Sequence, residues 1–119
     1  MRLPFGENAV VEPLKLLAYC LNPAHEEGKH KARVFRAALG LTAKDAEFLR
    51  ARLLLAARDG EVHQQRQTAF GVLYDVDFTM EYNGHSARIR SGWILESGSC
   101  IPRLTTCFIV KRGALHVHG

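Results

Sequence analysis

The sequence predicts an α+β domain in which three helices precede a small antiparallel sheet. Apolar residues recur at helical spacing over residues 13–21, 29–39 and 42–59, whereas residues 72–82 alternate between apolar and polar side chains. The dipeptide Asn83-Gly84 follows directly, and it favours a two-residue hairpin turn. Since all the helices precede the strands, we expect them to pack on one face of an antiparallel β-meander of three to four strands.

The first helix is expected to begin at Pro13 and to end before Asn22-Pro23, because proline suits the first position of a helix but not its interior. Its core-facing stripe is expected to comprise four residues (Leu14, Leu17, Ala18 and Leu21).

The second and third helices have clear ends. The second follows a loop and ends at Gly40, and the third begins at Thr42 as N-cap, with Asp45 at the capping-box position. The third helix ends at Asp59-Gly60, and its apolar stripe contains Ala46, Leu49, Leu53, Ala56 and Ala57.

Residues 61–68 are polar and are predicted to be a mobile loop. The hairpin after them has a testable register. With Tyr82 opposite His85, the turn pairs Phe78 with Ile89, Met80 with Ala87 and Tyr74 with Trp93, and on the other face Asp77 with Arg90 and Thr79 with Arg88. One face is therefore apolar and the other has matched charges, as cross-strand pairing requires.

A third strand is predicted over Leu104–Val110, after a turn at Ser97-Gly98-Ser99. Simple alternation would place Leu104, Thr106, Phe108 and Val110 on one face. The exposed edge of this strand could pair with a second copy of the chain as a homodimer. Residues 113–119 would add a short edge segment or fray.

The chain has 119 residues, of which 47% are apolar and 24% charged, and this is ordinary for one globular domain. We expect a single domain over residues 1–119, with its helical part at about 9–59, its β-meander at about 70–111 and a tail at 112–119. No signal segment and no apolar run of membrane-spanning length is found, so we expect a cytoplasmic protein that does not contact membranes.

The most informative segment is Gly28–Arg36, which contains four Lys or Arg residues and His30 at the head of the second helix. The first turn of a helix exposes unpaired N–H groups, so such a segment suits an anion. The pI near 9.2 and the formal charge of +4 agree with nucleic acid or an acidic protein as partner.

Basic and hydroxyl-bearing side chains together suit RNA cleavage without a metal or other cofactor. We interpret His30 as acid or base, Lys31 and Arg103 as phosphate ligands, and Thr105 as an orienting group. Further contacts to nucleic acid are assigned to Lys29, Arg33, Arg88 and Arg90.

Each of these residues also has a structural interpretation. His30 and Lys31 could merely border the apolar stripe of their helix, with the lysine stem buried. Arg88 and Arg90 could serve only to pair with Thr79 and Asp77 across the hairpin, and this interpretation is favoured. Arg103 could form a salt bridge that stabilises the fold.

Other chemistries have little support. No GxSxG, P-loop, GxGxxG or zinc-deaminase signature occurs. His116 and His118 share one side of an extended segment but lack a third ligand, so no metal site is predicted. The chain has three cysteines, Cys20, Cys100 and Cys107, and they show no CxxC spacing. We interpret them as reduced thiols, and Cys107 as a small apolar side chain that fills space in its strand.

Several short segments are individually weak signals, but their order and spacing are informative. They are Leu3-Pro4, Glu7–Val11, Leu21-Asn22-Pro23, Gly28–Phe35, Leu39-Gly40-Leu41, Trp93-Ile94 and Pro102–Cys107. Together they resemble the bacterial domain of unknown function 6883 family, over roughly Leu3 to Ile109. Its members occur as standalone proteins and as C-terminal modules of phage-head-like or secreted toxin-like chains.

The layout also resembles the barnase–EndoU–colicin–RelE group of toxin ribonucleases, which carry an Arg-x-x-Thr/Ser pattern on a late strand. Arg103-Leu104-Thr105-Thr106 matches that pattern. The resemblance implies a toxin-type ribonuclease acting on RNA, paired with a small acidic antitoxin or immunity protein. The alternative is a non-catalytic binding module, or a degenerate toxin relative, that docks an acidic protein or nucleic acid.

Overall fold

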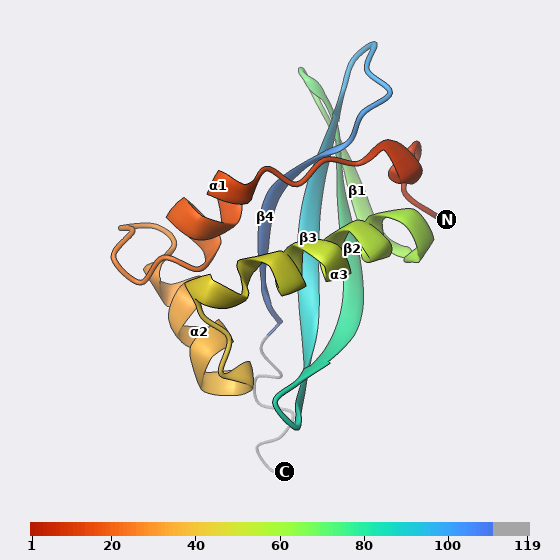
Figure 1. Cartoon of the computed structure of the whole chain (residues 1–119). Helices are drawn as coiled ribbons and strands as arrows, with labels where there is room; N and C mark the ends of the chain where they lie inside the picture. The colour runs from red at the N-terminus through yellow and green to blue at the C-terminus, as the bar shows by residue number, and fades with distance from the viewer. Residues whose placement is uncertain (111–119) are drawn as a thin grey trace, which may run out of the picture.

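A computed structural model describes residues 1–110 of the chain. Its centre is a four-stranded antiparallel sheet in the order β1-β2-β3-β4, and the helices gather on one face of it (Figure 1). The strands are β1 (Val62–Thr68), β2 (Gly71–Tyr82), β3 (His85–Glu96) and β4 (Arg103–Ile109). The predicted α+β class, with helices N-terminal to the strands, is confirmed.

The helical layer is built from three α-helices and three short turns. These are η1 (Gly6–Asn8), α1 (Pro13–Lys15), η2 (Leu16–Cys20), α2 (Lys29–Leu39), η3 (Ala43–Asp45) and α3 (Ala46–Asp59). Gly40 ends α2 in the left-handed conformation with a φ of 66°. The capping box is present, since the Thr42 N–H donates to the Asp45 carboxylate at 2.9 Å.

The stripe predicted for the first helix is wrong in part. Leu14 is 72% exposed and Leu17 42% exposed, whereas Leu16 and Cys20 are fully buried. The physical reason is η2, a π-helical turn that follows the single α-helical turn of α1. A π-helical turn holds more residues than an α-helical turn, so the buried face shifts relative to a 3.6-residue pattern.

The loop predicted over residues 61–68 is also wrong, because Val62–Thr68 forms strand β1 at the edge of the sheet. Its residues from His63 to Gln67 are exposed, so the strand has no apolar face that alternation could reveal. A bulge between Val62 and Gln64 further breaks the period. The sheet therefore begins at Val62 rather than near residue 70.

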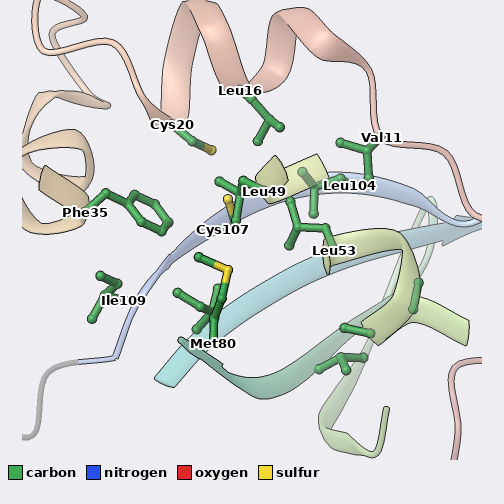
Figure 2. Close-up of a cluster of buried hydrophobic side chains, with 14 of the residues drawn as sticks. Val11, Leu16, Cys20, Phe35, Leu49, Leu53, Met80, Leu104, Cys107 and Ile109 are labelled. Atoms are coloured by element: carbon green, nitrogen blue, oxygen red, sulfur yellow. The ribbon is translucent and has the colours of Figure 1, made fainter. Parts of the chain in front are cut away.

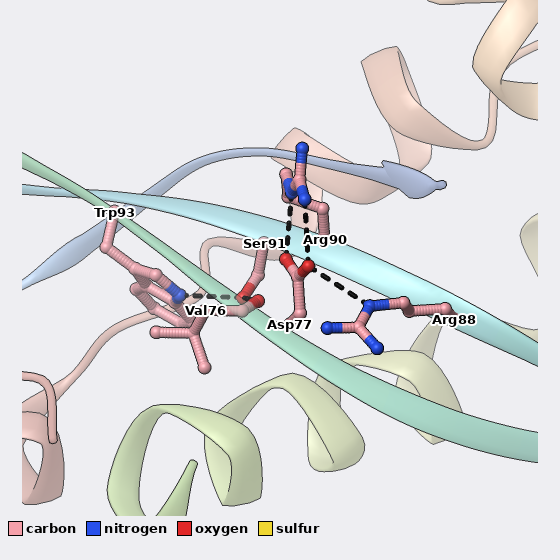
Figure 3. Close-up of polar contacts among 6 residues, drawn as sticks. All are labelled: Val76, Asp77, Arg88, Arg90, Ser91 and Trp93. Carbon is pink, nitrogen blue, oxygen red and sulfur yellow. Dashed lines mark hydrogen bonds and ion pairs between the residues drawn. The ribbon is translucent and has the colours of Figure 1, made fainter. Parts of the chain in front are cut away.

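The predicted hairpin register is confirmed at every pair, including Phe78 with Ile89 and Tyr74 with Trp93. Trp93 is fully buried, and its indole N–H donates to the Ser91 hydroxyl at 2.9 Å. That hydroxyl in turn donates to the Val76 carbonyl at 2.7 Å (Figure 3). The large aromatic ring is thus held in the core with its polar atom satisfied.

Strand β4 departs from the predicted alternation. A register shift opposite Gly92 and Trp93 lets Leu104 point into the core together with Cys107 and Ile109 (Figure 2). Phe108, expected on the same face as Leu104, lies on the opposite one as the partner of Arg90.

The outer edge of β4 is partly occupied. Leu104 N–H donates to the Val10 carbonyl at 3.1 Å, and Val10 N–H donates to the Pro102 carbonyl at 2.9 Å. A second copy of the chain therefore cannot pair with the start of this edge. Homodimerisation stays a prediction for the later part of β4 alone.

Candidate nucleic-acid interface

A groove of about 430 Å³ lies between α2 and the end of β4. We call it the α2–β4 groove. Its lining consists of His30, Lys31, Val34, Phe108, Ile109 and Val110. Among residues 1–110, the lining thus combines apolar side chains with two basic residues and includes no carboxylate. Such a groove suits a ligand with two parts, one flat and apolar and the other negatively charged.

Lys31 is the best-positioned cation of this groove. Its Nζ donates to the Tyr19 hydroxyl at 3.2 Å, and it lies 5.2 Å from the centre of the Tyr19 ring and 5.9 Å from the centre of the Phe108 ring. An ammonium between two aromatic rings is held by cation–π attraction as well as by the hydrogen bond. None of the ion pairs within residues 1–110 involves Lys31, so its charge is available to an anion.

Gly28 explains how α2 comes so close to η2. A Cβ atom at this position would clash with the Tyr19 carbonyl oxygen, so only glycine permits the contact. His25 fixes the preceding turn, because its Nδ1 accepts the N–H groups of Glu27 and Gly28, both at 3.0 Å. The His25 ring then packs edge-on against Tyr19 at 5.0 Å between centres. Tyr19 and His25 therefore fix the position of the Lys31 side chain: Tyr19 contacts it directly, and His25 packs against Tyr19. Neither residue was predicted from the sequence.

The signal for these two residues was weak. His25 stands three residues before the glycine that opens the basic helix, where a side-chain acceptor commonly caps a turn. Tyr19 carried no signal, since its partner depends on how η2 meets α2.

His30 is exposed at the groove beside Lys31, whereas the remaining basic residues of α2 lie elsewhere. Lys29 pairs with Glu26 at 3.5 Å. Arg33 lines a separate depression with Arg36 and Lys44, on another side of the helix. The structure thus brings His30 and Lys31 together and separates Arg33 from them.

Asp77, Arg88 and Arg90 form an ion cluster on the sheet face away from the core (Figure 3). The Asp77 carboxylate accepts bonds from Arg90 Nε at 2.8 Å, Arg90 Nη2 at 2.9 Å and Arg88 Nε at 3.2 Å. Burial is the largest influence on the Asp77 pKa and raises it, but the hydrogen bonds from Arg90 and Arg88 prevail and lower it. Both arginines are thus partners of Asp77, as the structural interpretation predicted for Arg90.

Arg103 and Thr105 lie further back along β4. Arg103 Nη2 is 3.2 Å from the Glu96 carboxylate, and both side chains are about half exposed. Thr105 Oγ1 would lie 2.9 Å from a Cβ atom at Gly92, so the glycine makes room for this hydroxyl. Ile109 lies six positions after Arg103, which corresponds to about 20 Å of extended strand. The four proposed catalytic residues therefore divide between the groove and the earlier part of β4.

Cys107 is buried beside Cys20 in the core (Figure 2). The hydrogen bond from its thiol to the Cys20 sulfur, together with burial, raises the pKa of Cys107 well above the ordinary value. A protonated, inaccessible thiol is a poor nucleophile, which agrees with its assignment as a core filler.

Within residues 1–110, no three His, Cys, Asp or Glu side chains gather where they could hold a metal ion. His116 and His118 lie outside the described residues. No helix of the described chain has the length and apolar character needed to cross a membrane.

The structure thus consists of a small α+β domain with a basic, partly apolar groove. A family model described as domain of unknown function DUF6883 matches residues 2–111, and the chain belongs to this family. The chain matches no curated protein. It is similar in fold to a chain of a contact-dependent growth inhibition toxin–immunity protein complex from Klebsiella pneumoniae 342, with a TM-score of 0.65 and 14% identity. That match covers 90% of this chain and 97% of the other.

Proposed function

We propose that this protein is a toxin-type endoribonuclease that cleaves RNA without a metal ion. The observation that carries the proposal is the α2–β4 groove, where the ammonium of Lys31 is fixed by Tyr19 beside the exposed imidazole of His30. The similarity in fold to a chain of a growth inhibition toxin–immunity protein complex supports the toxin class.

The reaction proposed is an internal transesterification. The ribose 2′-oxygen bonds to the adjacent phosphorus while the bond from phosphorus to the 5′-oxygen breaks, leaving a 2′,3′-cyclic phosphate and a free 5′-hydroxyl. His30 exchanges protons with the 2′-hydroxyl or the leaving oxygen, because imidazole does so near neutral pH. Lys31 stabilises the charge that develops on the phosphoryl oxygens.

The remaining candidates fit an RNA strand that continues along β4. Thr105 would hydrogen-bond a phosphate beside Gly92, and Arg103 would bind another one several nucleotides from the groove. Arg103 leaves Glu96 at little cost because exposed ion pairs contribute little. Arg88, Arg90, Lys29 and Arg33 would add positive potential rather than direct phosphate contacts, since three of them already have acidic partners.

A small acidic immunity protein is the proposed protein partner. It would cover the groove and neutralise His30 and Lys31, and its binding should weaken steeply with salt. Should RNA remain uncut, the same charges would serve a non-catalytic module that docks such a partner.

The test uses purified protein and a labelled RNA in the presence of a metal chelator. We expect cleavage to cyclic phosphate ends, no cleavage of the all-2′-deoxy strand, and a loss of about 100-fold or more in His30→Ala. Lys31→Met keeps the apolar stem of this half-buried residue and should show a similar loss. Lys44 is an exposed lysine of η3, so Lys44→Met should behave as wild type. Full cleavage by His30→Ala and Lys31→Met would refute the assignment.

Induction of the wild-type chain and of each variant in bacteria gives the matching growth assay. Growth arrest that is lost in His30→Ala and Lys31→Met but kept in Lys44→Met would support a toxin acting through the groove. Arrest without RNA fragments would favour the binding module.

A further inference from the structure

The later part of the outer edge of β4 has no backbone hydrogen-bond partner among residues 1–110. Val110 N–H donates to the Arg88 carbonyl at 2.9 Å, so the backbone groups of Val110 and Phe108 point toward β3. Those of Cys107 and Ile109 therefore point outward. Nearer the start of this edge, Leu104 N–H donates to the Val10 carbonyl.

Ile109 is the residue of this stretch that both lines the α2–β4 groove and directs its backbone groups outward. Its N–H and C=O have no hydrogen-bond partner among residues 1–110. An extended residue presents its N–H and C=O side by side, as a donor next to an acceptor. The Watson–Crick edge of each nucleobase offers the complementary pair, an acceptor next to a donor, and single-stranded bases are commonly recognised at this edge.

Phe108 supplies a matching flat surface. It is half-buried, it lines the same groove, and its ring lies 5.9 Å from the Lys31 ammonium. RNA-binding proteins commonly stack an unpaired base on an aromatic ring and place a cation at the adjoining phosphate. A groove of about 430 Å³ also has room for a single base.

We propose that the α2–β4 groove is a nucleobase subsite. The base packs on the Phe108 ring, its edge pairs with the N–H and C=O of Ile109, and its phosphate binds Lys31. This inference rests on the proposed function, because it places the base next to the scissile phosphate. An acidic peptide as occupant is the competing outcome of the test.

The first experiment measures cleavage of short RNAs that carry one abasic ribose, moved stepwise along the strand. We expect one abasic position to lower kcat/KM about 10-fold, the size of effect associated with one lost stacking contact. Phe108→Ala should lower kcat/KM on intact RNA by a similar factor but leave the rate on that abasic RNA unchanged. Phe108→Leu, which keeps most of the volume, should behave as Phe108→Ala, and Phe70→Ala is the control because Phe70 is 76% exposed at a turn.

Equal slowing of intact and abasic RNA by Phe108→Ala, or no slowing at all, would overturn the subsite while leaving the ribonuclease intact. A second measurement does not depend on cleavage. An uncleavable 2′-O-methyl RNA with 5-iodouracil should photo-cross-link at Phe108, and an excess of an acidic peptide should not suppress the cross-link.

The two proposals can therefore fail separately. A cross-link at Phe108 without any cleavage would keep the base subsite and refute the ribonuclease. Cleavage with no cross-link at Phe108, or with a cross-link abolished by the acidic peptide alone, would refute the base subsite.

Discussion

Asp77→Asn is the substitution whose effect the structure defines best. The Asp77 side chain is 3% exposed, Arg90 is 26% exposed and Arg88 is 56% exposed. The two bonds from Arg90 are charge-assisted and together are worth about 1.5–3 kcal/mol, while the exposed Arg88 contact adds less than about 1 kcal/mol. Asparagine keeps one acceptor oxygen, and both arginines can still reach water.

We therefore expect Asp77→Asn to lower the free energy of unfolding by about 1–2 kcal/mol at pH 7, a fall in Tm of about 4–8 °C for a domain of this size. The assay is denaturant unfolding followed by circular dichroism, supported by a thermal scan. Asp75→Asn is the matched control, because Asp75 lies on the same strand and face but forms no ion pair within residues 1–110.

The pH dependence gives the sharper test. The pKa of Asp77 is lower in the folded chain than in the unfolded chain, so its stabilising effect is complete above the unfolded pKa. That effect disappears as the pH falls below about 4 and through the folded pKa. The difference between wild type and Asp77→Asn should therefore shrink toward zero in strong acid. A difference that stays constant from pH 7 to pH 2, or an equal loss in Asp75→Asn, would refute the reasoning.

Two further substitutions probe buried and capping hydrogen bonds. Ser91→Ala removes the acceptor of the Trp93 indole N–H and should lower the free energy of unfolding, measured with denaturant, by about 1–3 kcal/mol. The control Ser86→Ala, on the exposed part of the same strand, should leave it almost unchanged. Equal losses in the two variants would contradict the role of the bond. Tyr82→Phe removes the hydroxyl that donates to Asp45 at 2.6 Å, the largest cause of the lowered Asp45 pKa. Carbon-13 NMR titration should show the Asp45 pKa rising toward its ordinary value, and an unchanged value would contradict the contact.

The fold was predictable where local rules and burial agree. The hairpin from Val72 onward combines a strict period of two with a turn dipeptide, so one register satisfies both faces. Gly40 and Thr42 likewise fix the ends of helices through local backbone chemistry. In contrast, β1 gave no signal because an exposed edge strand needs no apolar face.

The candidate site was predictable only in part. The basic segment identified His30 and Lys31, since charge clustering is visible in a single sequence. Tyr19 and His25 were missed because their importance depends on the meeting of η2 with α2, which the side chains alone do not specify. Arg103 and Thr105 share a strand with the groove, but strand length separates them from it.

One extra residue in β4 decides whether the groove can form. Uninterrupted alternation from Leu104 would turn Phe108 into the core and expose Ile109, since a shift of one residue exchanges the faces of a strand. The bulge near Thr105 instead keeps Leu104, Cys107 and Ile109 in the core and leaves Phe108 beside Lys31. The bulge that breaks the sequence pattern therefore also places an aromatic ring next to Lys31, the best-positioned cation of the groove. Bulges commonly re-aim a side chain in this way.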